Sequence, residues 1–188
     1  MSHTKTALNI IEARGGGRVE RAHGIPHHGS YSNAAHSWGV AMLMLQLWPE
    51  DFPRLAAACL IHDIPECWTG DIPAPSMRYI PGMKEAIGKI EDRLLARIDL
   101  PSYSDLPPED YRKLKACDWL EFWLWCREQQ AFGNKFAEEG RREIELYIES
   151  QQMPAPAYEV YLAMRDRSVV TSQAGVMRKT MEGDSGTL

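Results

Sequence analysis

Helical spacing of apolar residues dominates this chain and limits its fold more than any other feature. In the segment 33–48, for example, His36, Val40 and Leu43 fall on one face of a helix. Runs of β-branched residues, which favour strands, are nearly absent. We therefore predict an all-α fold, a single-domain helical bundle. The predicted helices cover 33–48, 54–63, 82–98, 109–131, 135–149 and 157–166.

The chain of 188 residues has the length of one domain. We predict that this domain covers residues 1–167. The segment 168–188 lacks periodicity and is predicted to be a flexible C-terminal tail. Loops are expected at 13–18, 23–32, 69–81 and 99–108.

Composition and charge restrict the partners. The net charge of −5 argues against a basic face for polymeric nucleic acid. No secretory signal and no apolar run of about 18 residues is present, so no membrane partner is expected. The four cysteines form no C-x-x-C pair and are predicted to be buried free thiols. A cytoplasmic protein is expected, in the host cytoplasm if it is phage-encoded.

Ionisable side chains interrupt three of the most apolar segments. His62 and Asp63 end the run RLAAACLIHD, His36 lies in AAHSWGVAML, and Asp118 lies in ACDWLEFWLWC. Each could singly be a core histidine or a solvated helix end. Three such exceptions in one small domain are most simply explained by one shared cation in the bundle core. Two imidazoles and two carboxylates suit a divalent metal such as Zn²⁺, Co²⁺ or Mn²⁺, with Mg²⁺ also considered, better than Ca²⁺.

Two further acids follow the His-Asp pair closely. Pro65 predicts a break or a tight turn over 62–66, which would bring Glu66 near the same ion. Asp71, in the turn Thr69-Gly70-Asp71, could reach it from the loop. Such a carboxylate can orient an attacking water or take its proton. The alternative for both is a solvated loop acid.

These motifs carry a family resemblance. The pattern of His36, His62-Asp63 and Asp118 resembles the H…HD…D signature of the HD superfamily of metal-dependent phosphohydrolases. HDIPECWTGDIPAP at 62–75 and LKACDWLEFWLWCREQQAFGN at 114–134 resemble segments of YfbR-like 5′-deoxynucleotidases, as does RVERAHGIP at 18–26. The resemblance implies an HD-type bundle with the metal in its core. It also implies that Glu66 and Asp71 are catalytic and that Arg21 binds substrate phosphate.

The chain departs from the nucleotidase pattern in two places. Ala35 replaces an acidic residue before the first histidine, and Ala22-His23 replaces an aromatic residue after the loop arginine. A histidine-bearing loop looks more like that of phage dATP triphosphohydrolases. The substrate implied is a small deoxynucleotide, either a triphosphate or a monophosphate. His23, Ile25 and Trp68 are candidate substrate contacts, although a core role is equally expected for the last two.

Two other functions stay open. One is hydrolysis of a cyclic nucleotide or an alarmone, although no Gly-Tyr-Pro follows the His-Asp pair. The other is a non-catalytic metal-binding regulator, which would not need Glu66, Asp71 or Arg21. The aromatic excess of 119–125 further predicts a helix–helix interface and hence a homo-oligomer, a dimer or higher.

Overall fold

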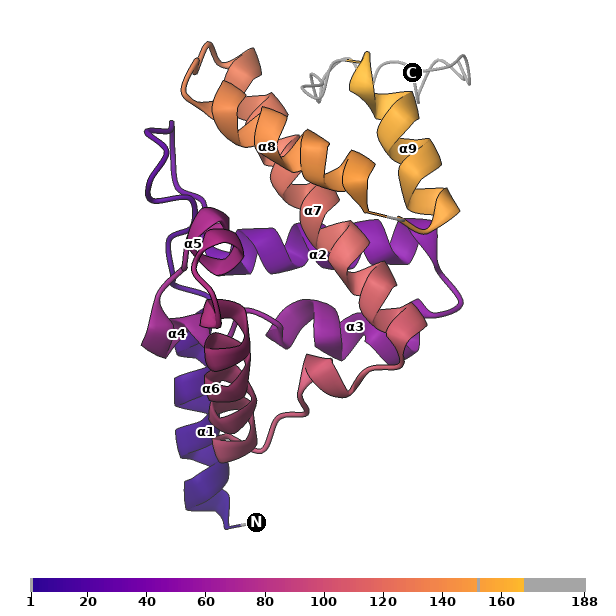
Figure 1. Ribbon diagram of the computed structural model, residues 1–188. Helices are drawn as coiled ribbons and strands as arrows, with labels where there is room; N and C mark the ends of the chain where they lie inside the picture. The colour runs from indigo at the N-terminus through magenta and orange to yellow at the C-terminus, as the bar shows by residue number, and fades with distance from the viewer. Residues whose placement is uncertain (1, 152, 168–188) are drawn as a thin grey trace, which may run out of the picture.

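A computed structural model describes residues 2–151 and 153–167, and the described part is helical (Figure 1). Glu20 and Ser32 form an isolated antiparallel β-bridge in the described part of the chain. The all-α prediction is confirmed, and the predicted tail lies outside the described residues. The helices are α1 (His3–Gly16), α2 (Asn33–Leu47), α3 (Phe52–Ile61), α4 (Glu66–Thr69), α5 (Ala74–Tyr79), α6 (Met83–Arg97), α7 (Pro108–Ala131), α8 (Ala137–Ser150) and α9 (Ala155–Arg165), with a 3-10 turn at Tyr103–Asp105.

The first core forms where α7 crosses α2 and α3 (Figure 1). Met44 of α2, Leu55 and Cys59 of α3, and Leu114 and Cys117 of α7 are fully buried there. Burying apolar surface stabilises this crossing by about 25 cal/mol for each Å² removed from water. The crossing therefore holds three helices in fixed positions around the residues predicted to bind metal.

A second core lies between α7, α8 and α9. Trp123 is fully buried, with its ring 5.2 Å from that of Tyr161, and its Nε1–H donates to Glu145 at 2.9 Å. Trp125 stacks on Tyr31 at 4.5 Å between ring centroids. The aromatic side chains of α7 are thus largely covered within one chain. The excess of aromatic residues in 119–125 therefore does not support the predicted helix–helix interface between chains.

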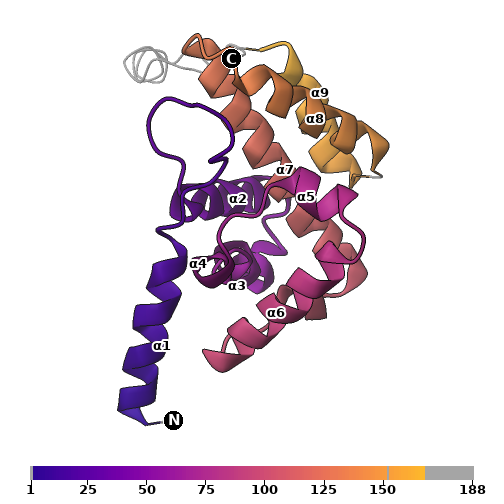
Figure 2. The same cartoon turned by 60° about the vertical axis from the view of Figure 1, so that its left-hand side comes forward.

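Three helices, α1, α4 and α5, were not predicted from the sequence. Segment 13–18 was expected to be a loop, but α1 continues to Gly16. A Cβ on Gly16 would lie 2.7 Å from Ile64 Cα, so glycine permits this close packing. Segment 69–81 was also expected to be a loop, yet α5 begins directly after Pro73, which is pre-organised to start a helix. In Figure 2, α1 extends below the crossing of α2, α3 and α7.

The cysteines and the helix lengths test two expectations from the sequence. All four cysteines are free thiols, but Cys67 is only partly buried. Within residues 2–151 and 153–167, no helix has the length and hydropathy needed to cross a bilayer.

Candidate metal centre

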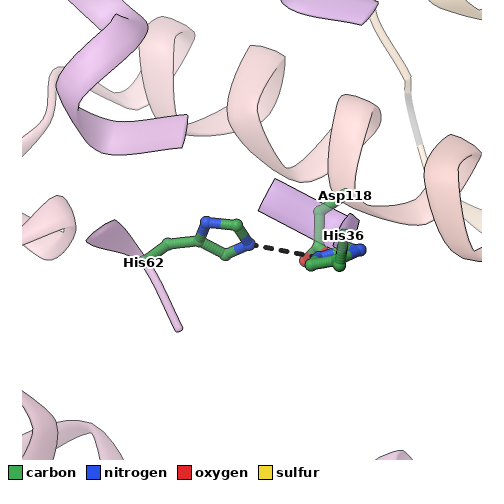
Figure 3. A group of neighbouring side chains, drawn as sticks. All are labelled: His36, His62 and Asp118. Carbon is green, nitrogen blue, oxygen red and sulfur yellow. Dashed lines mark hydrogen bonds and ion pairs between the residues drawn. The ribbon is translucent and has the colours of Figure 1, made fainter. Parts of the chain in front are cut away.

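Three core helices supply the predicted ligands. His36 lies in the first turns of α2, whose start is capped by Ser32 accepting the N–H of Ala35 at 3.4 Å. His62 directly follows α3, and Asp118 lies in the middle of α7. Figure 3 shows the side chains of His36, His62 and Asp118 converging from these elements. The tight turn expected over 62–66 is present, with α4 beginning at Glu66.

The donor atoms converge on His36 Nε2. This atom lies 3.3 Å from His62 Nε2, 3.1 Å from Asp118 Oδ1 and 3.4 Å from Asp63 Oδ2. Asp63 Oδ2 is also 3.2 Å from His62 Nε2. One ligand atom from each of His36, His62 and Asp118 falls within 4.8 Å of the others. The structure thus brings together all four residues expected to bind metal.

The far nitrogens of both rings face hydrogen-bond acceptors. His62 Nδ1 lies 3.0 Å from the carbonyl of Cys59, and His36 Nδ1 contacts the Glu121 carboxylate. A proton on each Nδ1 satisfies these acceptors and leaves a lone pair on each Nε2. Two lone pairs directed at one point beside two carboxylates form a donor set that fits a divalent cation.

Charge within the cluster favours a positive group. Burial and the Arg21 charge oppose protonation of His36, but hydrogen bonds to Asp118 and Glu121 raise its pKa to about 9. Burial lowers the pKa of His62. Burial disfavours the Asp118 carboxylate, yet Lys115 and His36 hold its pKa well below the usual range. A bound cation would replace the proton on His36, because metal binding displaces ligand protons.

Two basic side chains flank the ligand carboxylates. The Arg21 guanidinium pairs with Asp63 and lies 3.6 Å from Glu66, so the predicted phosphate-binding residue is at the cluster. Lys115 pairs with Asp118 from one turn earlier on α7. Positive groups at these positions can neutralise a phosphoryl group beside the ligands.

Glu66 lies between Arg21 and the start of α2. Its Oε2 accepts a hydrogen bond from Asn33 Nδ2 at 2.8 Å, and its side chain is 13% exposed. Burial, followed by the Asp63 charge, raises its pKa to about 8. A carboxyl group that titrates near neutral pH can both accept and return a proton.

Asp71 contacts the loop before α2 instead of the ligand cluster. Its Oδ2 accepts the N–H of Ala22 at 2.8 Å and lies 3.5 Å from Nδ1 of exposed His23. Ala22 has φ 52°, in the left-handed region that non-glycine residues rarely adopt. Asp71 therefore stabilises the turn that positions Arg21.

The other two candidate substrate contacts lie elsewhere. Ile25 packs against the buried cluster of Tyr31, Trp125 and Cys126. Trp68 is 39% exposed and lies under the Arg97 guanidinium, 5.1 Å from its ring centre. Neither residue is brought into the ligand cluster.

Three residues that contact a ligand side chain were not found from the sequence. Glu121 and Tyr31 contact His36, and Lys115 contacts Asp118. Glu121 did carry a signal, because it is a second acid in the apolar part of α7, one turn after Asp118. Its contact with Tyr31 joins positions 90 residues apart, and local spacing does not reveal such a contact.

Fold and site together define an all-helical domain built around a His/Asp metal-ligand cluster. The HD domain family model matches residues 19–122, which include all four ligand positions. The chain belongs to the HD domain family.

Named relatives fall into two groups. A 5′-deoxynucleotidase of Vibrio atlanticus is 28% identical over 131 residues, a match covering 58% of this chain and 68% of the relative. A dATP triphosphohydrolase of Salmonella phage PMBT28 is 32% identical over 102 residues, covering 47% of this chain and 50% of the relative. The chain thus spans between half and about two thirds of the length of these relatives.

Solved structures share the fold. The cyanophage S-2L HD phosphohydrolase DatZ, bound to dA and one catalytic Zn²⁺, superposes with a TM-score of 0.63 at 17% identity. That match covers 85% of this chain and 95% of DatZ. A conserved hypothetical protein of Pyrococcus furiosus gives a TM-score of 0.68 at 23% identity, with 85% and 98% coverage. These likenesses confirm the HD-type helical fold.

Proposed function

We propose that this protein is a divalent-metal-dependent phosphohydrolase of small deoxynucleotides. The observation that carries the proposal is the convergence of His62, Asp63 and Asp118 on His36 Nε2, each at 3.1–3.4 Å from it. The names of the relatives, a 5′-deoxynucleotidase and a dATP triphosphohydrolase, agree on the substrate class.

The residues around the ligands divide the chemical work. A cation held by the four ligands would polarise a phosphoryl oxygen. Arg21 binds the phosphate and stabilises the negative charge that develops on it. Glu66, buried beside Arg21, takes the proton of the attacking water. Asp71 keeps the loop turned so that Arg21 reaches the cluster.

A basic cavity that shares Lys115 with the surroundings of Asp118 supports a triphosphate over a monophosphate as the substrate. Its volume is about 530 Å³, in the range of small-molecule sites. Lys84, Arg112 and Lys115 line it, and no described lining residue is acidic. None of the four ligands lines the cavity, but Lys115, which does, also pairs with Asp118. Three cations suit a polyphosphate chain better than one phosphate group.

A nucleotide panel with product identification tests the proposal. Purified protein with Zn²⁺, Co²⁺, Mn²⁺ or Mg²⁺ is incubated with dNTPs and dNMPs. Tripolyphosphate released from dATP supports the triphosphohydrolase, and phosphate released from dAMP supports the 5′-deoxynucleotidase. No product from any nucleotide would refute the proposed function.

The cavity has its own test. Lys84→Met is expected to raise KM for the triphosphate and leave any monophosphate reaction unchanged. The matched control is Lys89→Met, an exposed lysine on the same helix that does not line the cavity. Equal KM values for the two variants would remove the cavity from the substrate site.

The alternative functions give different results in the same assays. If the protein hydrolyses a cyclic nucleotide or an alarmone, only that compound would be cleaved, and dNTPs and dNMPs would not. For a non-catalytic regulator, Glu66→Gln would leave both metal content and every measured reaction unchanged. The hydrolase account requires Glu66→Gln to retain metal and lose turnover.

We further propose a cytoplasmic homo-oligomer. Support comes from apolar side chains that a lone chain would leave in water: Ile11 of α1 is 67% exposed, Trp38 of α2 64% and Leu60 of α3 53%. Trp38 and Leu60 line the same shallow groove beside the end of α1, and Asp63 also lines it. Light scattering that gives a monomer mass would refute the oligomer.

A further inference from the structure

Glu121 connects two parts of the molecule at the metal centre. One of its carboxylate oxygens, Oε2, accepts hydrogen bonds from His36 Nδ1 and from the hydroxyl of Tyr31. The Tyr31 hydroxyl also lies 3.2 Å from His36 Nδ1. The three groups form a closed triangle on the side of His36 that faces away from the other ligands.

The triangle is shielded from water and fixed by packing. His36 is 0% exposed, Tyr31 is 2% exposed, and the Glu121 side chain is 14% exposed. The Tyr31 ring stacks on Trp125 with an interplanar angle of 13°. A hydrogen bond to a carboxylate in such surroundings is stronger than in water.

Gly39 makes room for the carboxylate. It lies one helical turn after His36, and a Cβ there would lie 2.5 Å from Glu121 Cγ and 3.0 Å from Oε1. A side chain at position 39 would therefore push Glu121 away from the histidine. Gly39 on α2 thus leaves the space that the Glu121 side chain on α7 occupies.

We propose that Glu121 is a positioning residue for the metal centre, with Tyr31 as its anchor. Glu121 keeps the proton of His36 on Nδ1 and the ring oriented so that Nε2 points at the other ligands. Tyr31 holds Glu121 in place by donating its hydroxyl proton to the same oxygen. This inference rests on the proposed metal site and assigns a role to two residues outside the ligand set.

Tyr31 also couples this contact to the substrate loop. Its carbonyl accepts the N–H of Arg21 at 2.7 Å, and the Arg21 guanidinium lies 5.8 Å from the centre of its ring. One tyrosine thus touches the acid that orients His36 and the arginine that would hold phosphate. Replacing it is expected to affect metal binding and substrate binding together.

Zinc affinity of the metal-stripped protein tests the proposal without an activity assay. Competition with a chromophoric chelator is compared for the wild type, Glu121→Ala, Glu121→Gln and Tyr31→Phe. Carboxylates behind a ligating histidine are typically worth about 10- to 100-fold in metal affinity. We expect a loss of this size for Glu121→Ala and smaller losses for Glu121→Gln, which keeps an acceptor oxygen, and for Tyr31→Phe.

The matched control is Glu128→Gln, which replaces an exposed glutamate on the same helix. A second readout is the NMR signal of the His36 Nδ1 proton in the zinc-loaded protein, which should exchange with water faster in Glu121→Gln. Glu121→Gln is nearly isosteric, so it tests the idea even if Glu121→Ala fails to fold.

The outcomes separate this inference from the proposed function. Wild-type zinc affinity and slow proton exchange in Glu121→Gln would overturn the positioning role and leave the metal site intact. Control-like affinity in a folded Glu121→Ala would overturn it as well. A wild-type protein that binds no divalent metal would overturn the site itself, and the positioning role with it.

Discussion

Replacing Gly39 by alanine should destabilise the protein, against the usual rule for helices. In a helix interior, Gly→Ala normally stabilises by about 1 kcal/mol. Here the new Cβ would lie 2.5 Å from Glu121 Cγ, so Glu121 must move and lose its hydrogen bonds to His36 and Tyr31. Two hydrogen bonds to a charged group contribute about 3–6 kcal/mol. After the gain in helix propensity is subtracted, the free energy of unfolding is expected to fall by about 2–5 kcal/mol.

Urea unfolding in the presence of a chelator measures this loss without any contribution from metal. The control is Gly88→Ala in α6, where a Cβ would meet nothing within 4 Å and should raise stability by up to about 1 kcal/mol. The same metal-stripped Gly39→Ala should bind zinc more weakly than the wild type. A Gly39→Ala protein as stable as Gly88→Ala would refute the packing argument and the fixed position of Glu121.

Three further predictions concern other parts of the chain. Cys67, which is partly buried, should react first with a disulfide reagent in the native protein. Burial raises the pKa of Cys59 and of Cys126 to about 12, so these two thiols should react only on unfolding. Equal reaction rates for the three thiols would contradict this order. Asp71→Ala should raise the KM for nucleotide about tenfold, because a hydrogen bond to a carboxylate is lost, and leave metal content unchanged; loss of metal would instead make Asp71 part of the ligand cluster. Trp123→Ala should lower the free energy of unfolding by about 3–5 kcal/mol in denaturant titrations, since the ring is fully buried; a loss below about 1 kcal/mol would show that the second core is loosely packed.

The strongly periodic helices could be predicted from the sequence. Segments 33–48 and 109–131 match α2 and α7 to within one residue at each end. Their apolar faces leave few other ways to fold. α1 was missed because the glycine run 15–17 signals a loop, whereas the helix extends to Gly16 by packing against the backbone of Ile64. That contact is tertiary, and local propensity carries no information about it.

The four ligand positions could be predicted for a different reason. Asp118 and the histidines are polar groups in segments that otherwise belong to a core, and such groups need a partner. The partners of Arg21 and Glu121 depend on how the 17–32 segment lies against α2 and α7. Sequence spacing does not fix that arrangement. The family resemblance predicted Arg21, whereas the only signal for Glu121 is its place as a second acid in the apolar part of α7.

Metal content measured by mass spectrometry tests the central claim most directly. The wild type and His62→Ala are stripped with a chelator, loaded with zinc, and dialysed against metal-free buffer. His62 is 4% exposed and contributes Nε2 to the cluster, so its loss opens the ligand set without changing the helix cores. We expect about one zinc ion per wild-type chain and almost none in His62→Ala. Equal metal content in the two proteins, or none in the wild type, would contradict it.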